Sequence, residues 1–245
     1  MALLFEYSLR IFPGLVLITL IFLLFPKNAV LTKIFLLIFG FILMRDAMTP
    51  MGLWTFGIDE GTIWLRFIDD GFILIALALT SLVLTVGILY FNKSLRQYIL
   101  WFGRYKITSL VVGFIGGVVV IIPFYFMYMG TSAEELGGAV SLELLLPLLI
   151  FSLFGNFTEE VLFRGYLQGY LETQLSSWHA VLLSGLIFAM GHIFLAVTVT
   201  DLGIAVILFT LYEGIICAVV RKNHGVIAAT ITHGMTIFIL ASGLL

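Results

Sequence analysis

The stretch Ile107–Ala133, ITSLVVGFIGGVVVIIPFYFMYMGTSA, contains no charged residue. A helix needs about 20 predominantly apolar residues to span the roughly 30 Å of hydrocarbon in a bilayer. Backbone N–H and C=O groups cannot stay unpaired in hydrocarbon, so an α-helix is the structure available to a single open segment. The stretch therefore predicts a transmembrane helix.

The rest of the chain repeats this pattern. Gly71–Phe91 is also free of charge, and further apolar segments with few ionisable residues are Ile11–Pro26, Ala29–Met44, Ser141–Leu171, His179–Val197, Leu202–Val220 and Gly225–Leu240. We therefore expect an all-α, polytopic membrane protein with about eight transmembrane helices that enclose an intramembrane cavity. The division we expect is residues 1–106 as N-terminal transmembrane helices and residues 107–245 as a helical core, within one integrated membrane domain.

The composition agrees with a lipid environment. Of the 245 residues, 62% are hydrophobic and 11% are charged, whereas about 25% are charged in soluble domains. The bilayer is therefore the expected partner. A net charge of −2 supplies no basic field for a phosphate backbone, which argues against a nucleic-acid partner. We expect an integral protein of the cytoplasmic membrane of a prokaryote.

Charged residues inside these segments are the candidates for function, because a charge at the bilayer centre costs at least a few kcal/mol. Glu159, Glu160 and Arg164 lie within one apolar segment. Glu160 and Arg164 have the i,i+4 spacing of a favourable helical ion pair. The side chain of Glu159 diverges from that of Glu160 by about 100°. We expect a supporting Glu160–Arg164 pair and a free acid or base at Glu159, although all three could simply lock helices together.

Two histidines lie at a similar depth on other predicted helices, His192 and His233. One carboxylate with two imidazoles can activate water for attack on a carbonyl, either directly or around a metal. The direct route requires no cofactor. For the second route, the ligands would be Glu159, His192 and His233, and zinc could be the metal. The spacing is not the His-Glu-x-x-His of a compact zinc motif, and both routes stay open.

Three motifs in this order resemble a known family. Glu159-Glu160-x-x-x-Arg164, Phe188-x-x-x-His192 and His233 are similar to the motifs of the CPBP (CAAX protease and bacteriocin-processing, or Abi) intramembrane proteases. The resemblance covers residues 107–245 and implies that this core is catalytic. It implies an α-helical, glutamate-dependent endopeptidase, often classed as a metalloendopeptidase. Its substrates would be prenylated or leader-peptide proteins, since the best-known members trim the last three residues from prenylated CAAX proteins.

The resemblance also implies roles for single residues. Glu159 resembles the water-activating glutamate of the family, and His192 resembles its partner, which positions and polarises the water. Glu160 and Arg164 resemble the supporting pair. His233 resembles the residue that binds the oxyanion.

One position departs from the family pattern. The oxyanion-binding histidine is expected to act with an Asn or Asp four positions later, but this chain has Ile237 there. Losing one such donor typically costs about 10²–10³ in rate. Asn156 lies one turn before the two glutamates, where it could bond to either carboxylate or replace the missing donor. Glu213, in the middle of another predicted helix, is expected to support His192, His233 or Arg164 rather than to act chemically.

Two other classes of function compete with a protease. A non-catalytic relative that acts as a scaffold or immunity protein is favoured by Ile237. A proton-coupled transporter is the other, because acids and histidines at mid-depth also form proton relays. Transporters commonly carry internal repeats, and this sequence shows none. The order of the motifs therefore favours the protease.

Overall fold

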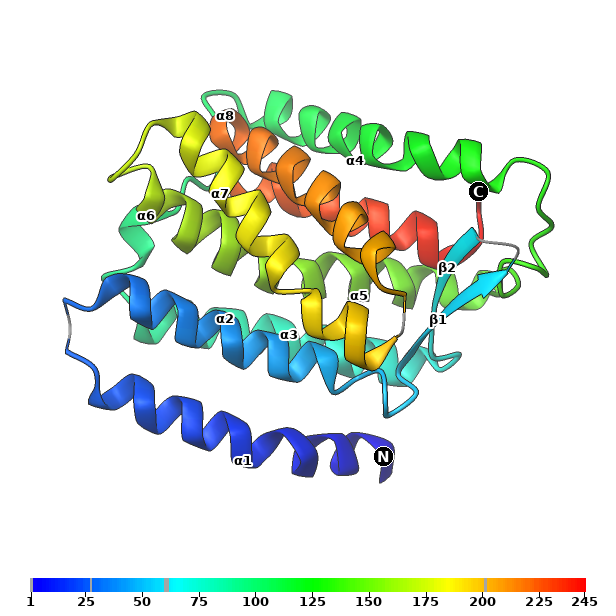
Figure 1. Ribbon diagram of the computed structural model, residues 1–245, viewed down its shortest axis with the longest axis horizontal. Helices are drawn as coiled ribbons and strands as arrows, with labels where there is room; N and C mark the ends of the chain where they lie inside the picture. The colour runs from blue at the N-terminus through cyan, green and yellow to red at the C-terminus, as the bar shows by residue number, and fades with distance from the viewer. Residues whose placement is uncertain (1, 27, 60–61, 201) are drawn as a thin grey trace.

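The computed structural model describes residues 2–26, 28–59, 62–200 and 202–245. It is a bundle of helices with one small β-hairpin at one end, beside the C-terminus (Figure 1). The α-helices are α1 (Ala2–Leu24), α2 (Val30–Asp46), α3 (Gly71–Phe91), α4 (Lys106–Tyr128), α5 (Leu142–Glu160), α6 (Gly169–Leu171), α7 (Ser177–Met190) and α8 (Ile204–Ser242). Shorter elements are the 3₁₀-helix η1 (Arg96–Tyr98) and the π-helices η2 (Val161–Gln168) and η3 (Leu195–Val199). The all-α membrane fold is confirmed.

Within the described residues, six helical segments are long and apolar enough to cross a membrane. The predicted number was about eight. The difference arises at two places: α2 has only 17 residues, and α8 contains two of the predicted segments, which are counted together although Gly225 separates them. Each of the eight predicted segments nevertheless corresponds to a helical part of the structure.

Helix α8 is a hairpin of two helices, 204–224 and 226–242. Gly225 between them has φ +85°, a backbone conformation that favours glycine. The Sγ atom of Cys217 lies 3.9 Å from the carbonyl oxygen of Ala229, whereas these residues would be about 18 Å apart along a straight helix. A Cβ atom at Gly225 would lie 2.5 Å from the carbonyl carbon of Trp101. The reversal therefore needs glycine both for its dihedral angle and for this close approach.

The second half of α8 packs closely on α4. A Cβ atom on Gly113 would lie 2.7 Å from the carbonyl oxygen of Ala228, and the hydroxyl of Thr232 donates a hydrogen bond to the carbonyl of Gly113 at 2.9 Å. Small residues allow two helix backbones to approach in this way. The contact fixes the helix that carries His233.

The β-hairpin is a part of the fold that the sequence analysis did not predict. Its strands are β1 (Trp54–Asp59) and β2 (Thr62–Phe67), and they pair in antiparallel register with Trp54 opposite Phe67 and Phe56 opposite Leu65. These four side chains line a partly open cavity within the bundle. From β2, Arg66 donates hydrogen bonds to the carbonyls of Gly138 at 2.7 Å and Leu240 at 2.9 Å. The hairpin is thereby tied to the C-terminal end of α8.

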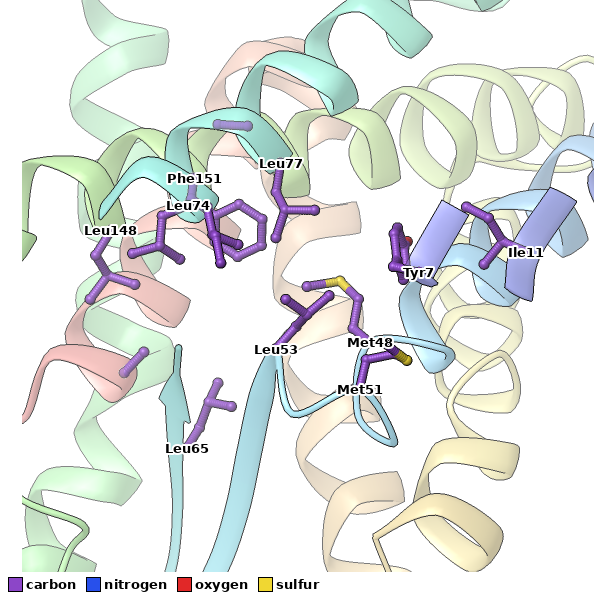
Figure 2. Close-up of a cluster of buried hydrophobic side chains, with 13 residues drawn as sticks. Tyr7, Ile11, Met48, Met51, Leu53, Leu65, Leu74, Leu77, Leu148 and Phe151 are labelled. Atoms are coloured by element: carbon purple, nitrogen blue, oxygen red, sulfur yellow. The ribbon is translucent and has the colours of Figure 1, made fainter. Parts of the chain in front are cut away.

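Buried apolar side chains join the N-terminal helices to the rest of the bundle. Figure 2 shows one such cluster, which connects α1, the segment between α2 and β1, the hairpin, α3, α5 and α8 and is formed by Tyr7, Ile11, Met48, Met51, Leu53, Leu65, Ile73, Leu74, Leu77, Ala78, Leu148, Phe151 and Ala241. A second cluster packs α2 against η2 and α7 through Ile34, Ile38, Val161, Leu162, Phe163 and Phe188. The N-terminal helices therefore form part of the wall around the site.

Candidate active site

A partly open cavity of about 800 Å³ lies within the bundle. This volume is within the usual range for small-molecule pockets, about 300–1,000 Å³. Most of its lining is apolar and comes from α1, α2, the hairpin, α3, α4, α5 and α8. The charged residues and histidines of the lining are Arg45, Glu159, His192, Glu213 and His233. Three sequence-predicted site residues, Glu159, His192 and His233, thus face one cavity.

The two adjacent glutamates face different surroundings. Glu159 lines the cavity. Glu160 is fully buried behind it, where its Oε1 lies 3.1 Å from Nη1 of the equally buried Arg164. Arg164 also donates a hydrogen bond to the carbonyl of Gly214 at 3.0 Å. Glu160 and Arg164 therefore form the i,i+4 ion pair that the helical spacing predicts, at the junction between α5 and the π-helix η2.

His192 follows the end of α7 and is held through both ring nitrogens. Its Nδ1 donates to the carbonyl of Phe188 at 2.8 Å. The Nε2 atom, which therefore carries the lone pair in the neutral ring, accepts a hydrogen bond from Nη1 of Arg45 at 2.8 Å. This Nε2 lies 3.9 Å from Oε1 of Glu159. The histidine is beside the glutamate, with the arginine bound to both.

Phe188 lies between the two histidines. Its ring centroid is 4.7 Å from that of His192 and 5.6 Å from that of His233. The face of the same ring also receives the guanidinium of Arg164, at 4.0 Å from the centroid, which is cation–π geometry. The aromatic residue of the Phe188-x-x-x-His192 motif thus fixes the spacing between both imidazoles and the supporting arginine.

Arg45 is a site residue that the sequence analysis missed. Its Nη1 lies 3.3 Å from Oε1 of Glu159, its Nε donates to Oδ1 of Asp46 at 2.8 Å, and its Nη2 donates to the carbonyl of Gly191 at 2.7 Å. Only 7% of Arg45 is exposed. In the sequence, an Arg-Asp pair directly after an apolar segment is typical of a helix end at the membrane surface. Burial of the pair could not be inferred without knowing which helix packs beside α2.

His233, on the second half of α8, is turned toward two carboxylates. Its Nδ1 donates to Oε1 of Glu160 at 2.9 Å, and its Nε2 lies 3.6 Å from Oε2 of Glu213. The reversal at Gly225 brings Glu213 and His233 together, although they belong to opposite halves of α8. Ile237 lines the cavity one turn after His233. The second oxyanion donor of the family pattern is therefore absent from that position.

Asn156 lines the cavity, but it does not bond to the glutamates as its spacing suggested. Its Nδ2 donates to the carbonyl of Ser152, one turn earlier on α5, at 2.7 Å. A carbonyl of the preceding turn competes successfully for the side-chain amide. Within the described residues, its carboxamide oxygen forms no hydrogen bond.

The arrangement of these residues does not fit a metal ion. Over the described parts of the chain, no group of three His, Cys, Asp or Glu side chains is placed to hold one. The lone pair of His192 already accepts a hydrogen bond from Arg45, and the same guanidinium nitrogen contacts Glu159. A cation of the protein itself thus lies between two of the three ligands considered from the sequence.

The fold and the site together define a polytopic membrane protein whose acids and histidines meet inside an apolar bundle. Residues 141–239 match the family model of the Rce1-like proteins, described as type II CAAX prenyl endopeptidase Rce1-like. The predicted resemblance to the CAAX proteases is confirmed for this stretch, which contains Glu159, Glu160, Arg164, His192 and His233. No curated protein and no solved structure matches the chain.

Proposed function

We propose that the protein is an intramembrane endopeptidase of the CAAX prenyl protease type, which hydrolyses a peptide bond with water activated by Glu159. The observation that carries the proposal is the division between the two glutamates. Glu159 faces the cavity, whereas Glu160 is buried behind it, where it pairs with Arg164 and with Nδ1 of His233. The match of this region to the Rce1-like family model supports peptide hydrolysis as the reaction.

In the first step, Glu159 acts as the general base. Arg45 contacts its Oε1, while Oε2 forms no hydrogen bond with the described residues and is the oxygen available to water. Glu159 takes one proton from the water as the oxygen adds to the carbonyl carbon of the substrate. The same carboxyl group then gives its proton to the leaving amine, so that the carboxylate is restored when the C–N bond breaks.

In this proposal His233 acts as an imidazolium, which carries a proton on each ring nitrogen, and its Nε2–H is the donor for the oxyanion. Its Nδ1 is anchored on Glu160 at 2.9 Å, which orients Nε2 toward the cavity side of the ring. A preorganised donor aimed at the developing negative charge stabilises the transition state more than the ground state. With Ile237 in place of the second donor, we expect slow turnover.

His192 acts differently from the role implied by the family resemblance. Both of its ring nitrogens are engaged, one by Phe188 and one by Arg45, so neither is available to polarise the water. We propose that His192 orients Arg45 and, through it, Glu159.

The lining of the cavity favours a substrate with a large apolar group. Aromatic side chains from the hairpin and α4 face it, namely Trp54, Phe56, Trp64, Phe67 and Phe124. Burial of apolar area is the main source of affinity in such a pocket. We propose a prenylated peptide as the substrate, and a leader peptide without a lipid as the alternative.

Cleavage assays with the purified protein in lipid nanodiscs test the proposal. Farnesylated CAAX peptides, the same peptides without the lipid, and leader peptides are incubated with and without a chelator, and mass spectrometry identifies the products. We expect release of the C-terminal tripeptide from the farnesylated peptide, with no effect of the chelator.

Two variants serve as controls for the same assay. Glu159→Gln keeps the size of the side chain but removes the proton acceptor, and it should reduce cleavage to background. Glu143→Gln removes an exposed acid at the start of α5 and should cleave like the wild type. Equal cleavage by Glu159→Gln would contradict the mechanism, and a folded wild type that cleaves none of the peptides would favour the scaffold function.

A further inference from the structure

Arg45 reaches the candidate active site from α2, which lies outside residues 141–239 of the family match. One of its nitrogens, Nη1, is 3.3 Å from Oε1 of Glu159 and 2.8 Å from Nε2 of His192. The other two guanidinium nitrogens are fixed by Asp46 and by the carbonyl of Gly191. All three nitrogens therefore have partners, and the plane of the guanidinium is defined.

This geometry differs from that of an arginine that only joins two helices. Arg221, for comparison, is also buried and bonds to Glu172 and to the carbonyl of Tyr98, away from the cavity lining. Arg45 lines the cavity and contacts both the acid and the imidazole that face it. The planar fork of a guanidinium can satisfy several partners at fixed angles, which an ammonium group cannot do.

A buried carboxylate with no cation nearby is costly and tends to take up a proton. The guanidinium of Arg164 pairs with Glu160 at 3.1 Å and makes no direct contact with Glu159 among the described interactions. Among the residues that the structure describes, the arginine in contact with Glu159 is Arg45. Arg45, a residue of the N-terminal helices, is therefore the cation whose direct contact favours the ionised, proton-accepting form of Glu159.

We propose that Arg45 is a positioning residue of the active site, whose guanidinium keeps Glu159 ionised and holds Oε1 so that Oε2 faces the water. The inference rests on the proposed function of Glu159 as a general base. In this proposal the guanidinium of Arg45, rather than a metal ion, lies between Glu159 and His192.

Kinetics of three variants test this role. Arg45→Ala should lower kcat by about 10- to 100-fold, as the loss of a group that orients an active-site ligand typically does, with little change in KM. Arg45→Lys should retain an intermediate rate, because the charge is kept and the fork is lost. Millimolar guanidinium chloride should restore part of the kcat of Arg45→Ala. Arg221→Ala is the matched control, which should keep the wild-type kcat and show no response to guanidinium.

A readout without catalysis is the thermal stability of double variants. Arg45→Ala leaves Glu159 as a buried, unpaired acid, so adding Glu159→Gln should raise the Tm above that of Arg45→Ala alone. Adding Glu160→Gln instead should lower the Tm further, because Glu160 pairs with Arg164 and His233.

The outcomes separate the two proposals. A wild-type kcat for Arg45→Ala, while Glu159→Gln is inactive, would overturn the role of Arg45 and leave the protease function standing. Additive Tm changes for Arg45→Ala and Glu159→Gln would overturn it as well, whether or not the wild type cleaves any peptide. If no peptide is cleaved by the wild type, the protease function fails, while coupled Tm changes would still support the pairing of Arg45 with Glu159.

Discussion

Glu160→Gln should destabilise the protein much more than Glu159→Gln, although the two residues are neighbours. Glu160 is fully buried, and its Oε1 binds both Arg164 at 3.1 Å and His233 at 2.9 Å. Among the described residues, Glu160 is the one acid within 4.0 Å of the Arg164 guanidinium. The substitution therefore leaves a fully buried cation without a counter-ion.

The magnitude follows from that contact. Breaking a buried ion pair by removing one partner costs about 3–5 kcal/mol. For a domain of this size, each kcal/mol corresponds to roughly 2–4 °C in Tm, so a loss of about 6–20 °C is expected. Glu159→Gln is expected to cost much less, because Arg45 keeps its contact with Asp46 at 2.8 Å.

The assay combines thermal unfolding in nanodiscs with cleavage of the farnesylated peptide, using the same preparations. Glu159→Gln should show little change in Tm and no cleavage. Glu160→Gln should show a lower Tm, and the fraction that remains folded should retain some activity. Equal loss of cleavage at unchanged Tm in both variants would refute the division into one catalytic and one supporting glutamate.

Three further predictions concern the turn in α8 and the proposed oxyanion site. Gly225→Ala should lower the free energy of unfolding by about 2–5 kcal/mol, because it combines a strained φ with overpacking against Trp101. The control Gly87→Ala, with open space around its Cβ position, should raise the free energy of unfolding by up to about 1 kcal/mol. A Gly225→Ala variant as stable as the wild type would contradict the reversal of α8 at Gly225. If the proposed function holds, Ile237→Asn should raise kcat by at most about 10²–10³ with little change in KM. Slower or unchanged cleavage would mean that another group already occupies the proposed oxyanion site. Glu213→Gln should change kcat less than tenfold, since the 3.6 Å between Glu213 Oε2 and His233 Nε2 exceeds hydrogen-bond distance. Loss of all cleavage in this variant would instead place Glu213 among the catalytic residues.

Much of the fold could be predicted because lipid imposes one solution on each long apolar segment. The Glu160–Arg164 pair was predictable for a similar reason, since it depends only on the geometry of one helix. The hairpin between α2 and α3 was not predicted, because its short alternating strands lie between charged residues and carry a far weaker signal than a membrane helix.

The sequence analysis missed Arg45 for a different reason. Arg45 and Glu159 are 114 positions apart in the sequence, and their contact depends on how α2 packs against η2 and α7. The predicted bond from Asn156 to a glutamate was wrong for a more local reason. The side-chain amide of Asn156 donates to the carbonyl of Ser152, one turn earlier on the same helix, instead of to a carboxylate. Periodicity within a helix identifies neighbours on that helix, but it gives no information about which partner a buried charge will find on another.

Glu159 and Glu160 are paired with different arginines, Arg45 and Arg164. This difference has a consequence for the insertion of the chain into the membrane during synthesis. A chain is synthesised from its N-terminus, so α2 with Arg45 precedes Glu159 by 114 residues, while Arg164 follows Glu160 within one turn. His233 arrives much later, 73 residues after Glu160. We therefore expect each acid to find a positive charge when its own helix enters the bilayer. We expect nascent chains that end after α6 to resist alkaline extraction from the membrane, and the same chains with Arg45→Ala to be extracted more readily.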